Sequence, residues 1–186
     1  MMIQKFFMSI GKFLLIFTMI FSCKPKVYKA ENLDKQRIDS LENEMRLASD
    51  KNPAEPDLKL AMYLAQAYQN YDVKYPKDSL SPKFLFKAGQ VIENVFDDKA
   101  RAAEIYFSIY NKYPQSKSAP FALFMTGNIF HTLQDTSHSV EMLEFFMAKY
   151  PDHELKNDAA SLIKSFGIEP DTGSRPVKEL PVNPIE

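Results

Sequence analysis

The sequence predicts an all-α fold of about seven helices arranged as stacked hairpins. The segment 73–91, VKYPKDSLSPKFLFKAGQV, returns 38 positions later as NKYPQSKSAPFALFMTGNI over residues 111–129, and a third Tyr-Pro pair begins at Tyr150. Helix-forming residues dominate from Glu31 to Phe166, where glycine is scarce. A fixed period in this range is typical of two-helix units that bury their apolar faces against one another. We therefore expect a helical hairpin solenoid over residues 31–167.

The first 22 residues have the pattern of a secretory signal. Lys5 and Lys12 come before a mostly apolar run, residues 13–21, and the small Ser22 follows it. A positive start, a short apolar run and a small residue are typical of an export signal, and such a run is too short to span a bilayer stably as a helix. We expect residues 1–22 to be a signal peptide.

The single cysteine, Cys23, directly follows this run, and one cysteine excludes an internal disulfide. The ending Ile20-Phe21-Ser22-Cys23 resembles a bacterial lipoprotein signal, although Phe21 is bulkier than the residue usual there. The resemblance implies that Cys23 carries lipid, that residues 23–30 are a linker, and that the chain is anchored in the bacterial cell envelope on the periplasmic side. In lipoproteins an aspartate after the cysteine often marks inner-membrane retention; Lys24 stands there and favours the outer membrane. The alternative is an uncut membrane anchor whose cysteine has no function.

Residues 31–49 and 57–75 predict the first helical hairpin. The segment from Asn52-Pro53 to Pro56 forms the turn between them. In both segments apolar residues recur three or four positions apart, as they do on one face of a helix. These residues are Ile38, Leu41, Met45 and Ala48, then Leu58, Ala61, Leu64, Ala65 and Tyr68. The alternative for residues 31–49 is a coiled-coil segment with Ile38, Leu41 and Met45 as its core positions.

Each of the next two units is expected to contain two helices. In the earlier unit the first helix ends near residue 95 and the second covers about residues 99–113. In the later unit the first helix ends near residue 133 and the second covers about residues 137–150. Aspartates precede the second helices, where a carboxylate interacts favourably with the helix dipole: Asp97 and Asp98 in one unit and Asp135 in the other. Each second helix should end at Tyr-Pro, because proline disfavours helical geometry in the residue before it. The expected core positions are Leu85, Ala88, Gly89, Ile92 and Val95; Ala102, Ala103, Tyr106, Ile109 and Tyr110; Leu123, Thr126, Gly127, Phe130 and Leu133; and Val140, Leu143, Phe146 and Met147.

Gly89 and Gly127 occupy equivalent places inside the two first helices. Glycine costs about 1 kcal/mol relative to alanine there. Its recurrence predicts a close helix contact that a side chain would block; the alternative is chance.

Residues 154–166 predict a closing helix that Gly167 terminates. Residues 168–186 contain four of the twelve prolines and little apolar surface, which is typical of a disordered tail.

The two central units resemble tetratricopeptide repeats. In one unit the resemblance is carried by residues 122–130, ALFMTGNIF, and continues through Leu133, Leu143 and Phe146 to Lys149-Tyr150-Pro151-Asp152; in the other it is carried by Gly89, Ile92, Ala102, Tyr106 and Pro114. It covers residues 57–166, and the period of 37–38 exceeds the ordinary 34. The Tyr-Pro-rich form is similar to the repeats of BamD-type envelope lipoproteins and of the Tol–Pal-associated periplasmic proteins.

This resemblance implies that one face of the first helices lines a protein-binding groove. The residues on that face are Lys83, Phe86, Gln90, Glu93 and Asn94 in one unit, and Phe121, Phe124, Asn128, His131 and Thr132 in the next. Phe86 and Phe124 are the expected anchors, because interface centres are enriched in aromatic residues. The alternative is that both rings are buried against the preceding unit.

The sequence offers little evidence for catalysis, for a metal or cofactor site, or for nucleic-acid binding. The net charge of −1 gives no basic field for nucleic acid, and the three histidines lack the spacing of a helical zinc site. The sequence contains neither a glycine-rich phosphate loop nor a Gly-x-Ser-x-Gly elbow, and the acidic pair Glu141 and Glu144 is expected on the surface. We expect no enzyme activity, no cofactor, no metal and no small-molecule substrate.

The expected function is a lipid-anchored scaffold that faces the periplasm and binds another envelope protein or a peptide segment through the helical-repeat surface. The alternative is an architectural subunit of a larger outer-membrane assembly or transport complex that has no groove ligand.

Overall fold

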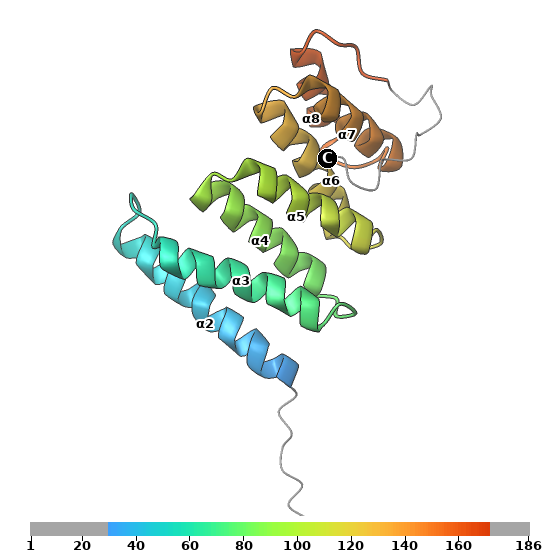
Figure 1. Ribbon diagram of the computed structural model, residues 1–186. Helices are drawn as coiled ribbons and strands as arrows, with labels where there is room; N and C mark the ends of the chain where they lie inside the picture. The colour runs from blue at the N-terminus through green and yellow to red at the C-terminus, as the bar shows by residue number, and fades with distance from the viewer. Residues whose placement is uncertain (1–29, 172–186) are drawn as a thin grey trace, which may run out of the picture. The chain divides into compact units, whose positions relative to one another are not determined.

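The computed structural model describes residues 30–171, and within this range the chain forms seven α-helices and no strand (Figure 1). They are α2 (Ala30–Lys51), α3 (Leu58–Lys74), α4 (Ser81–Phe96), α5 (Lys99–Lys112), α6 (Ser118–Thr132), α7 (Thr136–Lys149) and α8 (Lys156–Ser165). The all-α helical-hairpin fold is thereby confirmed. The expected signal peptide, the linker as far as residue 29 and the tail beyond residue 171 lie outside the described residues.

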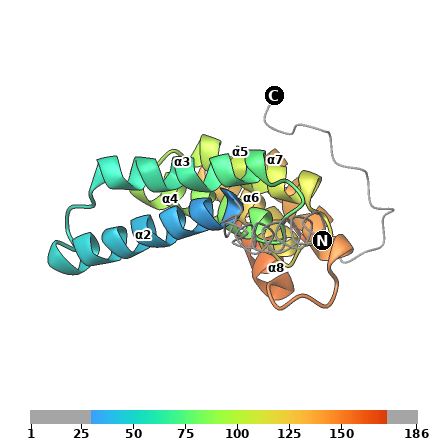
Figure 2. The ribbon, with the colours of Figure 1, turned by 90° about the horizontal axis from the view of Figure 1, so that it is seen from below.

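The chain divides into two units, Met1–Leu33 and Asp34–Glu186, and the packing described here lies within the second. Of the first unit, the structure describes only residues 30–33, the first turn of α2. From Asp34 onward α2 lies beside α3 in both ribbon views (Figures 1 and 2). Ile38 is 1% exposed and belongs to the same core cluster as Leu64 and Tyr68. The segment 31–49 therefore forms a hairpin with α3, as predicted, and not a separate coiled coil.

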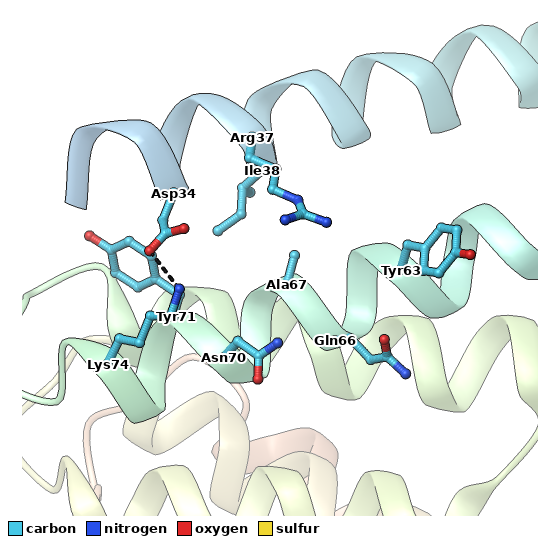
Figure 3. A pocket seen from close by; sticks show the side chains of 9 residues that line it. All are labelled: Asp34, Arg37, Ile38, Tyr63, Gln66, Ala67, Asn70, Tyr71 and Lys74. Atoms are coloured by element: carbon cyan, nitrogen blue, oxygen red, sulfur yellow. Dashed lines mark hydrogen bonds and ion pairs between the residues drawn. The ribbon is translucent and has the colours of Figure 1, made fainter. Parts of the chain in front are cut away.

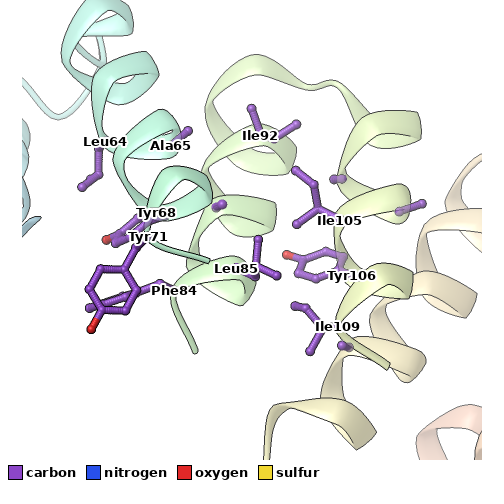
Figure 4. Packing of buried hydrophobic residues seen from close by; sticks show 14 of the residues in the cluster. Leu64, Ala65, Tyr68, Tyr71, Phe84, Leu85, Ile92, Ile105, Tyr106 and Ile109 are labelled. Atoms are coloured by element: carbon purple, nitrogen blue, oxygen red, sulfur yellow. The ribbon is translucent and has the colours of Figure 1, made fainter. Parts of the chain in front are cut away.

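Consecutive helices from α3 to α8 pack against one another, and α6 also contacts α4 and α8. Their buried faces form two core clusters. The first joins α2, α3, α4, α5 and α6 through residues that include Leu85, Ile92 and Tyr106 (Figure 4). The second joins α5, α6, α7 and α8 through residues that include Phe107, Leu143 and Ile163. Each hairpin thus buries its apolar stripe against its neighbours, as in stacked repeat units.

The second helix of each unit begins at an aspartate cap. The side chains of Asp57, Asp98 and Asp135 accept hydrogen bonds from the backbone N–H three residues later, at Leu60, Arg101 and His138. A carboxylate there satisfies a donor that has no partner within the helix and interacts favourably with the helix dipole. Asp97, which we expected beside Asp98 as a capping carboxylate, instead ends α4 with a left-handed φ of 53°.

Each second helix ends at the tyrosine of a Tyr-Pro pair, as predicted: Tyr75, Tyr113 and Tyr150 are the residues that follow α3, α5 and α7. Two positions of the expected apolar faces are exposed instead, and Leu58 at the start of α3 is one, with 55% of its surface accessible. Leu133 is 48% exposed, because α6 ends at Thr132 and the chain then turns through Gln134 at a φ of 60°.

The two helical glycines lie at close helix contacts. A Cβ atom on Gly89 would be 2.5 Å from the Tyr106 ring of α5, and one on Gly127 would be 2.8 Å from Leu143 of α7. Both distances are shorter than any normal carbon–carbon contact. The expectation that these glycines permit close packing of the first helix on the second is confirmed.

Candidate protein-interaction surface

The ten residues expected to bind a partner lie on α4 and α6, two helices that contact each other directly. We call these ten residues the first-helix face. Five are exposed: Lys83, Gln90, Asn94, Phe121 and Thr132. The other five are half-buried: Phe86, Glu93, Phe124, Asn128 and His131. The first-helix face therefore combines accessible polar side chains with partly accessible aromatic rings. That it binds a partner stays a prediction.

Phe86 and Phe124 hold equivalent positions in their units. The Phe86 ring lies 5.0 Å from the ring of Tyr106, and the Phe124 ring lies 5.6 Å from the ring of Phe146. Each phenylalanine therefore packs on the second helix of its own unit, where aromatic pairs add to the stability gained by burial. Sequence reasoning offered a free anchor or burial against the preceding unit. The structure shows a third arrangement, in which each ring is half-buried and packs within its own unit.

Glu93 also supports the fold. Its carboxylate accepts a hydrogen bond of 2.9 Å from the hydroxyl of Tyr106, whose ring is fully buried. Burial raises the pKa of Tyr106, and the charge of Glu93 adds to the effect, so the phenol stays protonated at physiological pH. The bond fixes Glu93 on the rim of the first-helix face.

The closing helix α8 covers part of α6. His131 Nε2 lies 2.7 Å from the hydroxyl of Ser165, and its ring is 4.7 Å from the ring of Phe166. Thr132 donates a hydrogen bond to the backbone of its own helix. His131 and Thr132 are therefore committed to internal contacts, and the rest of the first-helix face remains available to a partner.

Two side-chain amides on this available part have unused hydrogen-bonding capacity. Among the described residues, the amide groups of Gln90 and Asn128 make no hydrogen bond, whereas Asn94 donates to the backbone carbonyl of Gln90. Phe121 is 37% exposed and meets the ring of His153 edge-on at 4.8 Å. A polar amide beside an accessible aromatic ring can bind the backbone and an apolar side chain of a partner.

Sequence reasoning missed a repeated contact that connects successive units. The carboxylate of Asp34 accepts hydrogen bonds from Lys74 at 3.0 Å and from the hydroxyl of Tyr75 at 2.9 Å. One period later the buried carboxylate of Asp72 accepts from Lys112 and from the hydroxyl of Tyr113. The hydrogen bond from Lys74, helped by that from Tyr75, holds the pKa of Asp34 below its ordinary value.

A signal for this contact was present in the sequence. Asp34 and Asp72 are 38 residues apart, the same spacing that separates Tyr75 from Tyr113. One further period leads to Tyr110 instead of an aspartate, and the hydroxyl of Tyr150 is buried without a hydrogen-bond partner among the described residues. The Lys-Tyr-Pro motif therefore connects the first units through a carboxylate. In the last unit Tyr150 packs on Phe146 of its own helix, and the ring contact with the preceding unit is that of Phe145 with Tyr110.

A second polar contact joins α2, α3 and α4. The carboxylate of Glu42 accepts hydrogen bonds from Lys87 at 2.6 Å and from the hydroxyl of Tyr68 at 2.8 Å. Burial by itself raises the pKa of Glu42, but the bonds from Lys87 and Tyr68 outweigh it, so the pKa lies below its ordinary value. This group fixes the first hairpin relative to α4.

A small pocket of about 100 Å³ lies between α2 and α3 (Figure 3). It is lined by Asp34, Arg37, Ile38, Tyr63, Gln66, Ala67, Asn70, Tyr71 and Lys74. The ion pair of Asp34 with Lys74 crosses one end of it, so the charged groups there already satisfy each other. Drug-sized ligands occupy cavities of roughly 300–1,000 Å³. The pocket is therefore too small for a substrate of that size.

Residues 30–171 contain neither a candidate metal site nor a candidate membrane-spanning helix. No cluster of three histidine, cysteine or carboxylate side chains in this range is arranged to hold a metal ion. None of its helices has both the length and the hydropathy that are needed to cross a bilayer.

Comparison with known protein families and with curated proteins found no family model and no curated sequence that matches the chain.

Proposed function

We propose that this chain is a lipid-anchored scaffold of the bacterial cell envelope that faces the periplasm and binds another envelope protein, or a peptide segment of one, through the first-helix face. The observation that carries the proposal is the equivalent placement of Phe86 and Phe124 on neighbouring helices, with the uncommitted amides of Gln90 and Asn128 one turn further along each helix. Repeat proteins use such extended helical surfaces for binding. No catalytic group or cofactor forms part of the proposal.

The exposed part of the first-helix face should carry the binding energy. Replacing both Gln90 and Phe121 by alanine should weaken capture of the partner more than tenfold, because truncating an interface anchor costs roughly 2 kcal/mol or more. The melting temperature should change little, since both side chains are exposed. We choose this pair over Phe124, whose ring packs on Phe146, so that its removal would also lower stability.

The matched control is the double variant Met62→Ala and Val73→Ala on α3. It removes two exposed apolar side chains from a helix outside the first-helix face. Capture should be measured by affinity pull-down after mild crosslinking, with circular dichroism on every variant. If the Gln90 and Phe121 variant keeps wild-type capture while the α3 variant loses it, the first-helix face is not the binding site.

One observation favours a second function, an architectural subunit of a larger outer-membrane assembly. Leu58, Met62 and Val73 are exposed, and their spacing places them on one side of α3. The equivalent side of α5 carries Ala100 and Asn111 where α3 has Met62 and Val73. We call Leu58, Met62 and Val73 the α3 stripe. Exposed apolar side chains that share one face can mark a contact with another protein.

Lipid attachment is tested at Cys23. The variant Cys23→Ser should remain uncleaved by the lipoprotein signal peptidase and should incorporate no fatty-acid label, because the thiol is the expected acylation site. A single acyl chain binds membranes only marginally, so stable anchoring requires more than one. Metabolic labelling with a fatty acid and the mass of the mature protein give the answer. Equal labelling of the variant and the wild type would rule out Cys23 as the anchor.

A further inference from the structure

Two Tyr-Pro turns lie on the same edge of the helical array, together with Asp34 of α2. The hydroxyl of Tyr75 binds Asp34, the first residue of the Asp34–Glu186 unit, and the hydroxyl of Tyr113 binds Asp72 in the last turn of α3. The turns over 75–80 and 113–117 lie on one side of the ribbon in Figure 1. We call these two turns, with the helix ends that flank them, the Tyr-Pro edge.

The Tyr-Pro edge carries more lysines than carboxylates. Its carboxylates each pair with a lysine: Asp34 with Lys74, Asp72 with Lys112 and Asp78 with Lys35. Two further lysines, Lys77 and Lys117, are exposed and form no ion pair with any described residue. The third Tyr-Pro turn adds no excess, because Asp152 and Glu154 offset Lys149 and Lys156 there.

The opposite edge lacks this excess of positive charge: five carboxylates there stand with Lys51, Lys59, Lys99 and Arg101, and Lys99 pairs with Asp97. The aspartate caps Asp57, Asp98 and Asp135 all lie where second helices begin, together with Asp97 and Glu55. An anionic surface would therefore attract the Tyr-Pro edge more strongly than this opposite edge, which we call the acidic edge. The difference selects one orientation of the domain on such a surface.

The position of the proposed lipid also favours the Tyr-Pro edge. Cys23 lies eleven positions before Asp34 in the sequence. A fully extended chain of that length spans at most about 40 Å. A lipid on Cys23 therefore keeps Asp34 and the Tyr-Pro edge within about 40 Å of the bilayer, whereas the chain runs the length of α2 before it reaches Glu55 and Asp57 at the acidic edge.

We propose that the anchored chain lies with its Tyr-Pro edge on the surface of a bilayer that contains anionic phospholipids, with Lys77 and Lys117 against the headgroup phosphates. The inference rests on the proposed lipid attachment at Cys23. Because α4 and α6 begin at this edge and run away from it, the docked domain leaves Gln90 and Asn128 accessible to a partner.

The test measures which edge approaches the lipid. Full-length lipidated protein carries one added cysteine, either Gln115→Cys in the second Tyr-Pro turn or Glu55→Cys at the acidic edge, labelled with a fluorophore. The vesicles contain phosphatidylcholine with about one third phosphatidylglycerol and a headgroup-linked quencher. We expect strong quenching at position 115 and weak quenching at position 55. About 0.5 M salt should remove the difference, because it reduces the screening length to a few ångströms.

Charge reversal identifies the lysines. The double variant Lys77→Glu and Lys117→Glu should weaken docking by at least about 25-fold, since each lysine near an anionic surface contributes about a factor of five. The control Lys51→Glu and Arg101→Glu makes the same charge change on exposed residues near the acidic edge and should leave quenching at position 115 unchanged. Equal quenching at positions 115 and 55, or equal effects of the two double variants, would overturn the inference.

Flotation with pure phosphatidylcholine vesicles separates this inference from the proposal on which it rests. Anchored protein floats with these neutral vesicles whatever its orientation. If the wild type floats and shows no preference between the two labels, lipid attachment holds and the orientation is wrong. If it does not float, lipid attachment fails and the inference fails with it.

Discussion

Replacing Phe130 by alanine should lower the free energy of unfolding by roughly 3–5 kcal/mol, the usual cost of truncating a buried aromatic residue. Phe130 is 7% exposed and belongs to the second core cluster, and its ring lies 5.1 Å from that of His138 at the start of α7. The cluster contains residues of α5, α6, α7 and α8, so the cavity would weaken the contacts of α6 on both sides.

Chemical denaturation of the two proteins measures the loss. Phe121→Ala on the same helix is the matched control, because it removes the same ring from an exposed position and should cost less than about 1 kcal/mol. If Phe130→Ala costs no more than Phe121→Ala, Phe130 is not a core residue and the alignment of the repeats is wrong.

Gly89→Ala should destabilise the protein by about 2 kcal/mol, although alanine is the better helix former by about 1 kcal/mol. The added Cβ atom would lie 2.5 Å from the ring of Tyr106, which is fully buried and held by Phe86 and by its hydrogen bond to Glu93. The ring cannot move without breaking these contacts.

A second background shows whether the clash is the cause. In a protein that already carries Tyr106→Ala the space beside Gly89 is open, so the same Gly89→Ala change should become neutral or stabilising, as helix propensity alone predicts. Thermal unfolding of the four proteins in this cycle gives the coupling energy. A stabilising effect of Gly89→Ala in the wild type would show that α4 and α5 do not pack this closely.

Features that repeat with the period of the chain could be predicted from the sequence. Asp98 and Asp135 precede apolar helices and Tyr113 precedes proline, so local rules for helix ends gave the boundaries. Gly89 and Gly127 were found because a costly residue recurred at the same place. In each case one physical requirement acts within a few residues along the chain.

Features that depend on distances between helices could not be predicted in the same way. Helical spacing placed Phe86 and Phe124 on the correct side of their helices, but it does not show how far a ring reaches toward the next helix, so their half-burial was missed. His131 contacts α8, which lies outside the repeated units and follows no period. The bonds of Asp34 and Asp72 join residues about 40 positions apart, and only the 38-residue spacing of the two aspartates pointed to them.

Site-specific photo-crosslinking in living cells tests most directly whether the first-helix face binds the partner. A photoreactive amino acid would replace Gln90 or Asn128 on that face, and Met62 or Gln69 on α3 in control proteins. We expect positions 90 and 128 to give a crosslinked product of the same partner mass, and positions 62 and 69 to give none. Products from positions 62 and 69 alone would contradict the account, and would identify the α3 stripe as the contact of an architectural subunit.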